Sequence, residues 1–131
     1  MPKHDSCHDA VADALEREGW QVLSDQRRKR ERRAIFIDLL ASRDNRTTFI
    51  EVKCFSGEAF ADEQYTAIGQ YLTYRTFLRL EGLNQSLYLA VPARIYEESF
   101  DDVMLETLKE HHIWLLIFDE TRQRNLQWIA W

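Results

Sequence analysis

The first apolar positions of the chain follow the spacing of an amphipathic helix. They stand at i, i+4, i+7 and i+8, a spacing that places side chains on one helix face. These positions are Cys7, Val11, Ala14 and Leu15. Ser6 can cap the start of the helix, because its hydroxyl accepts a hydrogen bond from a free backbone N–H. Gly19 ends the helix, since glycine readily adopts the conformation that follows one.

Apolar runs farther along the chain predict strands, and two longer periodic stretches predict helices. The expected strands cover residues 20–23, 34–41, 47–54, 87–91, 113–118 and 126–131. The expected helices cover 60–80, ending near Gly82, and 99–111. Their apolar faces are Ala61, Tyr65, Ile68 and Leu72 in the first, and Phe100, Val103, Met104 and Leu108 in the second.

This order of elements predicts an α/β fold with a mixed central sheet flanked by helices, in a single domain over residues 1–131. The strand at 47–54, the helix at 60–80 and the strand at 87–91 form one βαβ unit. We expect its crossover to be right-handed, as nearly all such connections are.

The composition is typical of a folded protein. Of the 131 residues, 45% are hydrophobic and 12% aromatic, enough to offset the entropy of ordering the chain. No apolar run approaches the ~20 residues that span a bilayer, and the polar start is unlike a signal peptide. Cys7 and Cys54 are far apart in the sequence, so we expect free thiols in a reducing compartment. The sequence therefore predicts a cytoplasmic protein without a membrane segment.

The strands at 34–41 and 47–54 can pair around a turn between Asp44 and Asn45, residue types that tolerate turn backbones. Opposed residue numbers then add up to 89, which sets Asp38 opposite Glu51. This register gives one wholly apolar face, made of Ile35, Ile37, Leu39, Ile50, Val52 and Cys54. The other face carries Phe36, Asp38, Leu40, Phe49, Glu51 and Lys53.

Two carboxylates that face each other across paired strands repel, because their Cβ atoms are about 4.5–5.5 Å apart. A divalent cation bound by Asp38 and Glu51 converts this repulsion into ligation, and hard oxygen ligands suit Mg²⁺. Lys53 lies on the same face, where it can orient a water or stabilise charge on a phosphate. The alternative is a structural strand surface in which Lys53 neutralises Glu51 and Asp38 caps a sheet edge.

Asp38, followed thirteen residues later by Glu51-Val52-Lys53 on a hairpin between two helices, resembles the core of the PD-(D/E)xK nuclease superfamily. Gln70 and Tyr74 resemble the Q-x₃-Y motif of some members. A closer resemblance covers nearly the whole chain, to the XisH family of fdxN element excision controlling factors. The matching blocks are His8-Asp9-Ala10-Val11, Ala14-Leu15, Gly19-Trp20, Asp38-Leu39, Glu51-Val52-Lys53, Gly69-Gln70-Tyr71 and Leu87-Tyr88-Leu89-Ala90-Val91-Pro92.

The resemblance implies a three-layer, restriction-endonuclease-like fold. It also implies a role in excision of a DNA element, beside a site-specific recombinase and a small partner protein, XisI. Asp38 and Glu51 would bind the metal, helped by the Val52 carbonyl, and Lys53 would be the catalytic lysine. Superfamily nucleases often have an acid on the first helix, where this chain has His8 followed by Asp9. Either residue supports the site, or both have a capping or packing role.

Other candidates keep two interpretations each. Gln70 either orients a substrate phosphate or the water beside Lys53, or is an ordinary helix hydrogen-bonding residue. Tyr74 either lies near the site or belongs to an aromatic core with Tyr65, Tyr71 and Phe77. Zinc binding by His4, Cys7 and His8 is disfavoured, because no second pair of ligands complements them.

The charge is unevenly distributed. The formal net charge is −5, yet residues 27–33 are all basic except Glu31. Arg28 and Arg30 in this block either contact the DNA backbone or belong to a solvated loop. At the other end, the tryptophans of the terminal strand suggest core packing or a homodimer interface.

Two functional hypotheses follow. In the first, the protein is a metal-dependent endodeoxyribonuclease-like factor in which Asp38 and Glu51 hold Mg²⁺ or Mn²⁺. Lys53 then assists the attacking water and Gln70 positions the phosphate. In the second, the protein is a catalytically silent accessory factor that retains the nuclease fold and binds DNA, an XisI-like protein or the recombinase.

Overall fold

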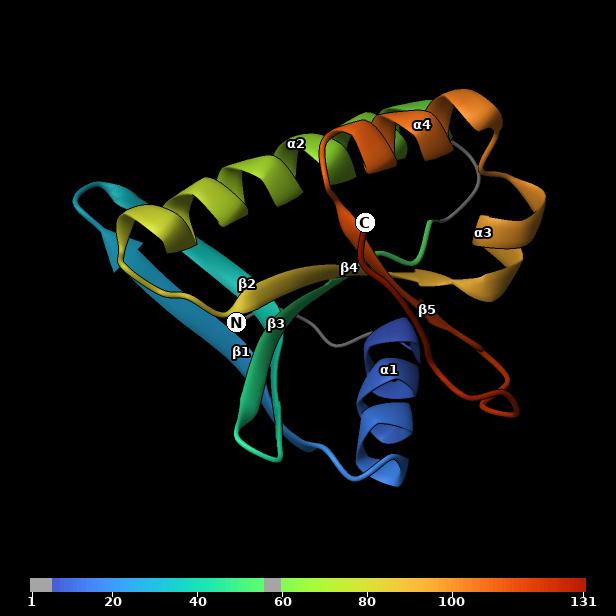
Figure 1. Cartoon of the computed structure of the whole chain (residues 1–131), viewed down its shortest axis with the longest axis horizontal. Helices are drawn as coiled ribbons and strands as arrows, with labels where there is room; N and C mark the ends of the chain where they lie inside the picture. The colour runs from blue at the N-terminus through green and yellow to red at the C-terminus, as the bar shows by residue number, and fades with distance from the viewer. Residues whose placement is uncertain (1–5, 56–59) are drawn as a thin grey trace.

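A computed structural model describes residues 6–55 and 60–131. Its centre is a six-stranded sheet in the order β1-β2-β3-β4-β5-β6, with α1 on one face and α2 and α4 on the other (Figure 1). The strands are β1 (Gln21–Arg30), β2 (Arg33–Arg43), β3 (Arg46–Val52), β4 (Ser86–Pro92), β5 (Trp114–Phe118) and β6 (Gln127–Ile129). The helices are α1 (Ser6–Arg17), α2 (Phe60–Leu80), α3 (Ala93–Glu98) and α4 (Asp102–Glu110). The expected mixed α/β architecture with a flanked sheet is confirmed.

The sheet is mixed because its two halves are connected differently. Strands β1, β2 and β3 form an antiparallel meander, whereas β3, β4 and β5 are parallel and β6 is antiparallel to β5. Parallel neighbours need a crossover, which α2 supplies between β3 and β4 and the α3–α4 pair supplies between β4 and β5. The meander brings the two acidic strands together, and the first crossover sets α2 above them.

The turn between β2 and β3 forms as the sequence predicts. Asp44 and Asn45 have φ values of 50° and 65°, which asparagine and aspartate tolerate better than most residues. The ladder that follows pairs Arg43 with Arg46 and ends with Leu39 opposite Ile50, all in the expected register.

The side-chain alternation of this hairpin changes face at Asp38, contrary to the sequence prediction. Leu39 and Ile50 pack in the core beside α1, whereas Ile35 and Ile37 pack with Phe49 in the core beside α2. The ladder between β1 and β2 pairs Ser24 with Leu39 and resumes with Gln26 and Ile37. Between these pairs Asp25, opposite Asp38, has a φ of 55°, which departs from regular strand backbone. The expected single apolar face is thus divided between two cores.

Strand β1 is much longer than the expected strand at 20–23. It continues through the basic block and pairs with β2 as far as Arg30 opposite Arg33, with the turn at 31–32. The block is therefore part of a hairpin and not a loop. Its strand signal is hidden in the sequence because no residue of β1 is fully buried, which leaves no apolar alternation to recognise.

The helices differ from the predictions in detail. Helix α2 has the expected bounds, but its buried residues are Ala67, Tyr71, Phe77 and Leu78, and Tyr65 is 69% exposed. Helix α3 was not expected, because six residues are too few to show a helical period. Helix α4 begins only after Asp101, whose carboxylate accepts a hydrogen bond from the N–H of Met104. Val103, expected in the apolar stripe, is 70% exposed.

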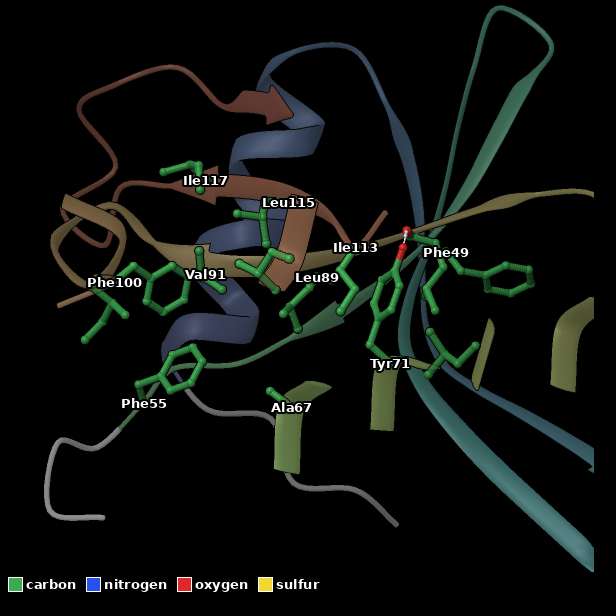
Figure 2. Close-up of a cluster of buried hydrophobic side chains, with 14 of the residues drawn as sticks. Phe49, Phe55, Ala67, Tyr71, Leu89, Val91, Phe100, Ile113, Leu115 and Ile117 are labelled. Atoms are coloured by element: carbon green, nitrogen blue, oxygen red, sulfur yellow. Dashed lines mark hydrogen bonds between the residues drawn. The ribbon is translucent and has the colours of Figure 1, made fainter. Parts of the chain in front are cut away.

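The larger core fills the space between the sheet and α2, α3 and α4. Figure 2 shows the aromatic and aliphatic side chains that meet there, among them Phe49, Tyr71 and Leu89. The Tyr71 hydroxyl donates to the Leu87 carbonyl at 2.6 Å, so helix α2 is hydrogen-bonded directly to the sheet backbone. The smaller core packs α1 under the sheet through Val11, Leu15 and their neighbours. Both cores fix the position of the acidic hairpin.

Cys7 and Cys54 are joined in a disulfide, which corrects the expectation of free thiols. The two Cα atoms are 5.7 Å apart, within the range that a disulfide spans. The sequence separation of 47 residues concealed this proximity, which arises only when α1 packs against the end of β3. Among the helices that the structure describes, none combines the length and apolar character needed to cross a bilayer.

Candidate functional site

The centre of the site is the place where β2 and β3 separate. Strand β3 stays paired with β4 as far as Val52, whereas its ladder with β2 ends at Ile50. In the gap, the Val52 N–H donates to Asp38 Oδ2 at 2.7 Å and the Asp38 N–H donates to Glu51 Oε1 at 3.2 Å. Each carboxylate therefore holds backbone of the opposite strand, and the two carboxylates are brought together as the register predicts.

Glu51 is an acid in an environment unfavourable to its charge. Glu51 is only 5% exposed. Burial raises the pKa of Glu51 from 4.5 to about 8, and the nearby Asp38 carboxylate adds to the rise. Lys53 acts in the opposite direction, with Nζ 3.6 Å from Glu51 Oε2. The ionised form of Glu51 is therefore unfavourable at this position unless more positive charge lies nearby.

Lys53 takes its position from the sheet. Its N–H donates to the Ala90 carbonyl at 2.9 Å, which continues the β3–β4 pairing by one step beyond the end of β3. This pairing keeps Lys53 in alternation with Glu51, so both side chains lie on the same face. The predicted grouping of Asp38, Glu51 and Lys53 is therefore present in the structure.

Gln70 and Tyr74 lie one turn apart on α2, which packs on one face of the sheet. Gln70 Nε2 donates to the Tyr74 hydroxyl at 2.9 Å, as their spacing of four residues allows. Burial raises the pKa of Tyr74, and the Glu51 and Asp38 carboxylates add smaller contributions in the same direction. These electrostatic contributions mean that Tyr74 lies near the two acids. Tyr74 also packs partly against the larger core, so both interpretations of this residue apply.

Gln70 has one polar atom in an unusual position. Its Oε1 is buried and has no hydrogen-bond partner among the described residues. A buried acceptor without a partner costs about 1–3 kcal/mol, unless a ligand or water supplies a donor. Because the atom without a partner is an acceptor, this orientation suits the proton of a water or a cation.

The donor set fits a hard divalent cation. Asp38 and Glu51 each use one oxygen on a backbone N–H, which leaves Asp38 Oδ1 and Glu51 Oε2 without a backbone partner, and Glu51 Oε2 also lies 3.6 Å from Lys53 Nζ. Mg²⁺ and Mn²⁺ prefer such oxygens and keep open positions for water or phosphate. A cation between the acids would also remove the penalty that holds the Glu51 pKa high, so the residues present are suited to one.

The candidates on α1 lie on the opposite side of the sheet from α2 (Figure 1). His8 is buried on the face of α1 that packs against the smaller core. Asp9 is exposed. Among the described residues, Asp9 does not join Asp38 and Glu51 in a cluster of potential metal-ligand atoms. His4 lies outside the described residues.

The basic hairpin, which carries residues 27–33 at the β1–β2 turn, comes close to the site through Arg28. The Arg28 guanidinium lies 5.7 Å from the centre of the Phe49 ring, two residues before Glu51. Arg30 instead binds the C-terminal end of α2, with Nη1 2.7 Å from Glu81 Oε2 and 3.2 Å from the Leu80 carbonyl. A groove of about 840 Å³ lies between the hairpin tip and α2, and Arg30, Arg32 and Arg33 are among its lining residues.

The sequence analysis missed a second group of potential ligand atoms, formed by Cys7, Cys54 and Glu120. Its members come from three elements, and Glu120 is 113 residues from Cys7. Neither cysteine has a partner at motif spacing, so no local signal in the sequence could have identified the group.

Comparisons with known proteins agree on one family. A family model described as XisH protein matches residues 1–126. A solved XisH family protein from Nostoc punctiforme PCC 73102 is 33% identical, with a TM-score of 0.88 over 95% of this chain and 99% of that one. An fdxN element excision controlling factor protein from Anabaena variabilis is 31% identical, with a TM-score of 0.89 over 96% and 99%.

A third solved structure, of a protein of unknown function, shares the fold alone. It is 17% identical, with a TM-score of 0.56 over 85% of this chain and 57% of that one. No curated protein matches the chain.

Proposed function

Because the chain belongs to the XisH family, we propose that it is a metal-dependent, endonuclease-like DNA factor. In this role it supports excision of a DNA element by a site-specific recombinase, together with an XisI-like partner. The observation that carries the proposal is the pair of crossed hydrogen bonds that the Asp38 and Glu51 carboxylates accept from backbone N–H groups of the opposite strand, at the point where β2 and β3 separate. This arrangement holds the half-buried Asp38 beside the buried Glu51, where a cation would stabilise the ionised form of both acids.

The chemistry we infer is hydrolysis of a phosphodiester bond in the manner of PD-(D/E)xK nucleases. Asp38 and Glu51 would hold Mg²⁺ or Mn²⁺, which supplies positive charge that offsets the charge of the phosphate. The Lys53 ammonium, 3.6 Å from Glu51, would add charge stabilisation and orient the attacking water. Gln70 Oε1 would accept a hydrogen bond from that water, because this buried acceptor has no other partner among the described residues.

Calorimetric titration with Mn²⁺ tests the metal site directly. We expect the folded wild type to bind Mn²⁺ and Glu51→Gln to lose binding, because the amide removes the negative charge that favours the cation. Glu97→Gln is the matched control, since Glu97 pairs with Arg124 on the surface. Absence of binding by the folded wild type at millimolar Mn²⁺, or equal binding by Glu51→Gln, would contradict the metal-dependent function.

One observation favours the second candidate, a catalytically silent accessory factor. Asp9, the acid on α1, is exposed on a helix that lies across the sheet from α2. The site therefore lacks the first-helix acid that many superfamily nucleases use. A silent factor would act by binding DNA, an XisI-like protein or the recombinase. The Mn²⁺ titration separates the two candidates, because a silent factor has no need of the cation.

DNA binding is tested independently of catalysis. With a chelator present, Arg28→Glu should weaken binding of a short DNA duplex about tenfold and reduce the slope of log affinity against log salt by about 1, as loss of one phosphate contact does. Arg28 is the better probe than Arg30, because Arg30 is bound to Glu81. Lys109→Glu, in the last turn of α4, has the same charge change and serves as the control. Equal affinities and slopes for wild type and Arg28→Glu would remove the basic hairpin from the DNA interface.

A further inference from the structure

A second group of ligand atoms lies on the other side of the sheet from the acidic pair. Cys7 extends from α1, Cys54 follows the end of β3, and Glu120 follows the end of β5. Their sulfur and carboxylate oxygen atoms all lie within 4.8 Å of one another. Cys7 is 1% exposed, so the inner part of this group is shielded from water. Three separate elements thus direct donor atoms to one point.

Glu120 is held in place by a neighbouring arginine. Arg94 Nε donates to Glu120 Oε1 at 2.6 Å, and Arg94 Nη2 lies 3.4 Å from Oε2. Glu120 Oε2 lies 3.9 Å from Cys7 Sγ. The carboxylate is therefore oriented toward the cysteines by an ion pair, although the loop that carries it is on the surface.

We propose that Cys7, Cys54 and Glu120 bind a zinc-like divalent cation when the Cys7–Cys54 disulfide is reduced. Tetrahedral zinc has ligands at about 2.0–2.3 Å, so its donor atoms lie about 3.5–3.8 Å apart. The separation of 3.9 Å between Cys7 Sγ and Glu120 Oε2 already approaches this spacing. A water would take the fourth position.

The charges of such a site balance. Two thiolates and one carboxylate carry three negative charges, and the cation together with the Arg94 guanidinium carries three positive ones. Without the cation, two thiolates beside Glu120 would repel one another. Sulfur ligands distinguish this site from the Asp38–Glu51 pair, which offers only oxygen and favours harder ions.

The disulfide and the metal site exclude each other. A dithiol reductant transfers two electrons and two protons to the Cys7–Cys54 disulfide, breaking the S–S bond and becoming a disulfide itself. The cation then replaces the two thiol protons, which are released to solvent. The disulfide and the bound cation are therefore two alternative links between α1 and the chain segment that begins at Cys54.

Cobalt(II) is a suitable probe, because thiolate ligands give it an intense near-ultraviolet charge-transfer band that oxygen ligands do not give. After reduction with a phosphine, which is then removed, we expect one equivalent of Co²⁺ to produce this band and Zn²⁺ to abolish it. Cys54→Ser should eliminate the two-thiolate spectrum, and Glu120→Gln should lower the Co²⁺ affinity at least tenfold.

Controls separate this proposal from the function proposed above. Glu51→Gln should keep the charge-transfer band, because its carboxylate belongs to the other site, and Glu97→Gln should also keep it. The proposal is overturned if the reduced, folded wild type gives no charge-transfer band, or if Glu120→Gln binds Co²⁺ as tightly as the wild type. Should Cys54→Ser fail to fold, thiol reactivity of the wild type decides: Zn²⁺ must slow the reaction of both cysteines with an aromatic disulfide reagent.

Discussion

Replacing Glu51 with glutamine should stabilise the metal-free protein at pH 8 and above, by up to about 4 kcal/mol in the free energy of unfolding. Burial, with help from Asp38, raises the Glu51 pKa from 4.5 to about 8. At high pH the native protein must therefore hold a buried carboxylate, whereas the unfolded chain exposes it to water. Glutamine fills nearly the same volume without the charge, and its amide oxygen can still accept from the Asp38 N–H.

The sign of the pH dependence follows from the same two values. Below pH 4.5 both states carry the proton, so the native state is not penalised. Between pH 4.5 and about 8 the unfolded chain loses the proton and the native protein keeps it, so wild-type stability falls as pH rises. Urea unfolding over this range, with a chelator present, should give a flatter curve for Glu51→Gln than for wild type.

Two controls make the result specific. Glu97→Gln should follow the wild-type curve, because Glu97 lies in a surface ion pair. Added Mn²⁺ should stabilise wild type at pH 8 and leave Glu51→Gln unchanged, since only the native wild type would bind it. Parallel curves for wild type and Glu51→Gln would mean that Glu51 ionises as easily in the folded protein as in the unfolded one.

Phe49→Ala should have the largest destabilising effect near the site, about 3–5 kcal/mol in the free energy of unfolding. Phe49 is 1% exposed and lies in the larger core, two residues before Glu51, with the Arg28 guanidinium over its ring. Its truncation leaves a cavity between β3 and α2 and removes the contact that orients Arg28. Urea denaturation at neutral pH measures the loss.

Phe36→Ala is the matched control for this substitution. Phe36 lies on the neighbouring strand and is also covered by an arginine, Arg27, but it is 43% exposed. More than half of the Phe36 surface is still covered, so the expected loss is about 1–2 kcal/mol, clearly smaller than at Phe49. Similar losses of unfolding free energy in the two variants would show that the packing of Phe49 between β3 and α2 adds no special stability.

Local patterns explain which parts of the fold could be predicted. The hairpin from β2 to β3 and the bounds of α2 follow from alternation, turn chemistry and helical spacing within a few residues of each position. Helix α3 is too short to show a period, and β1 has no buried face to produce one. The change of face at Asp38 lies opposite the irregular backbone of Asp25 on another strand, and the alternation of β2 alone does not reveal it.

The acidic site could also be predicted from local sequence patterns. Asp38, Glu51 and Lys53 lie on paired strands whose register is set by one turn, and Gln70 and Tyr74 share a helix face. The group of Cys7, Cys54 and Glu120 depends on how α1 and the loop after β5 pack against the sheet. Such contacts between distant segments leave no periodic signal in a single sequence.

The crossed hydrogen bonds accepted by the Asp38 and Glu51 carboxylates also limit how this chain can vary. Each carboxylate accepts from a backbone N–H of the opposite strand, so a longer or shorter side chain at either position no longer fits the N–H that it binds. Exchanging aspartate for glutamate at either position alone would conserve charge and yet separate the two carboxylates. In related sequences the two positions should therefore be inherited as a pair, and a substitution at one should be accompanied by a compensating change at the other.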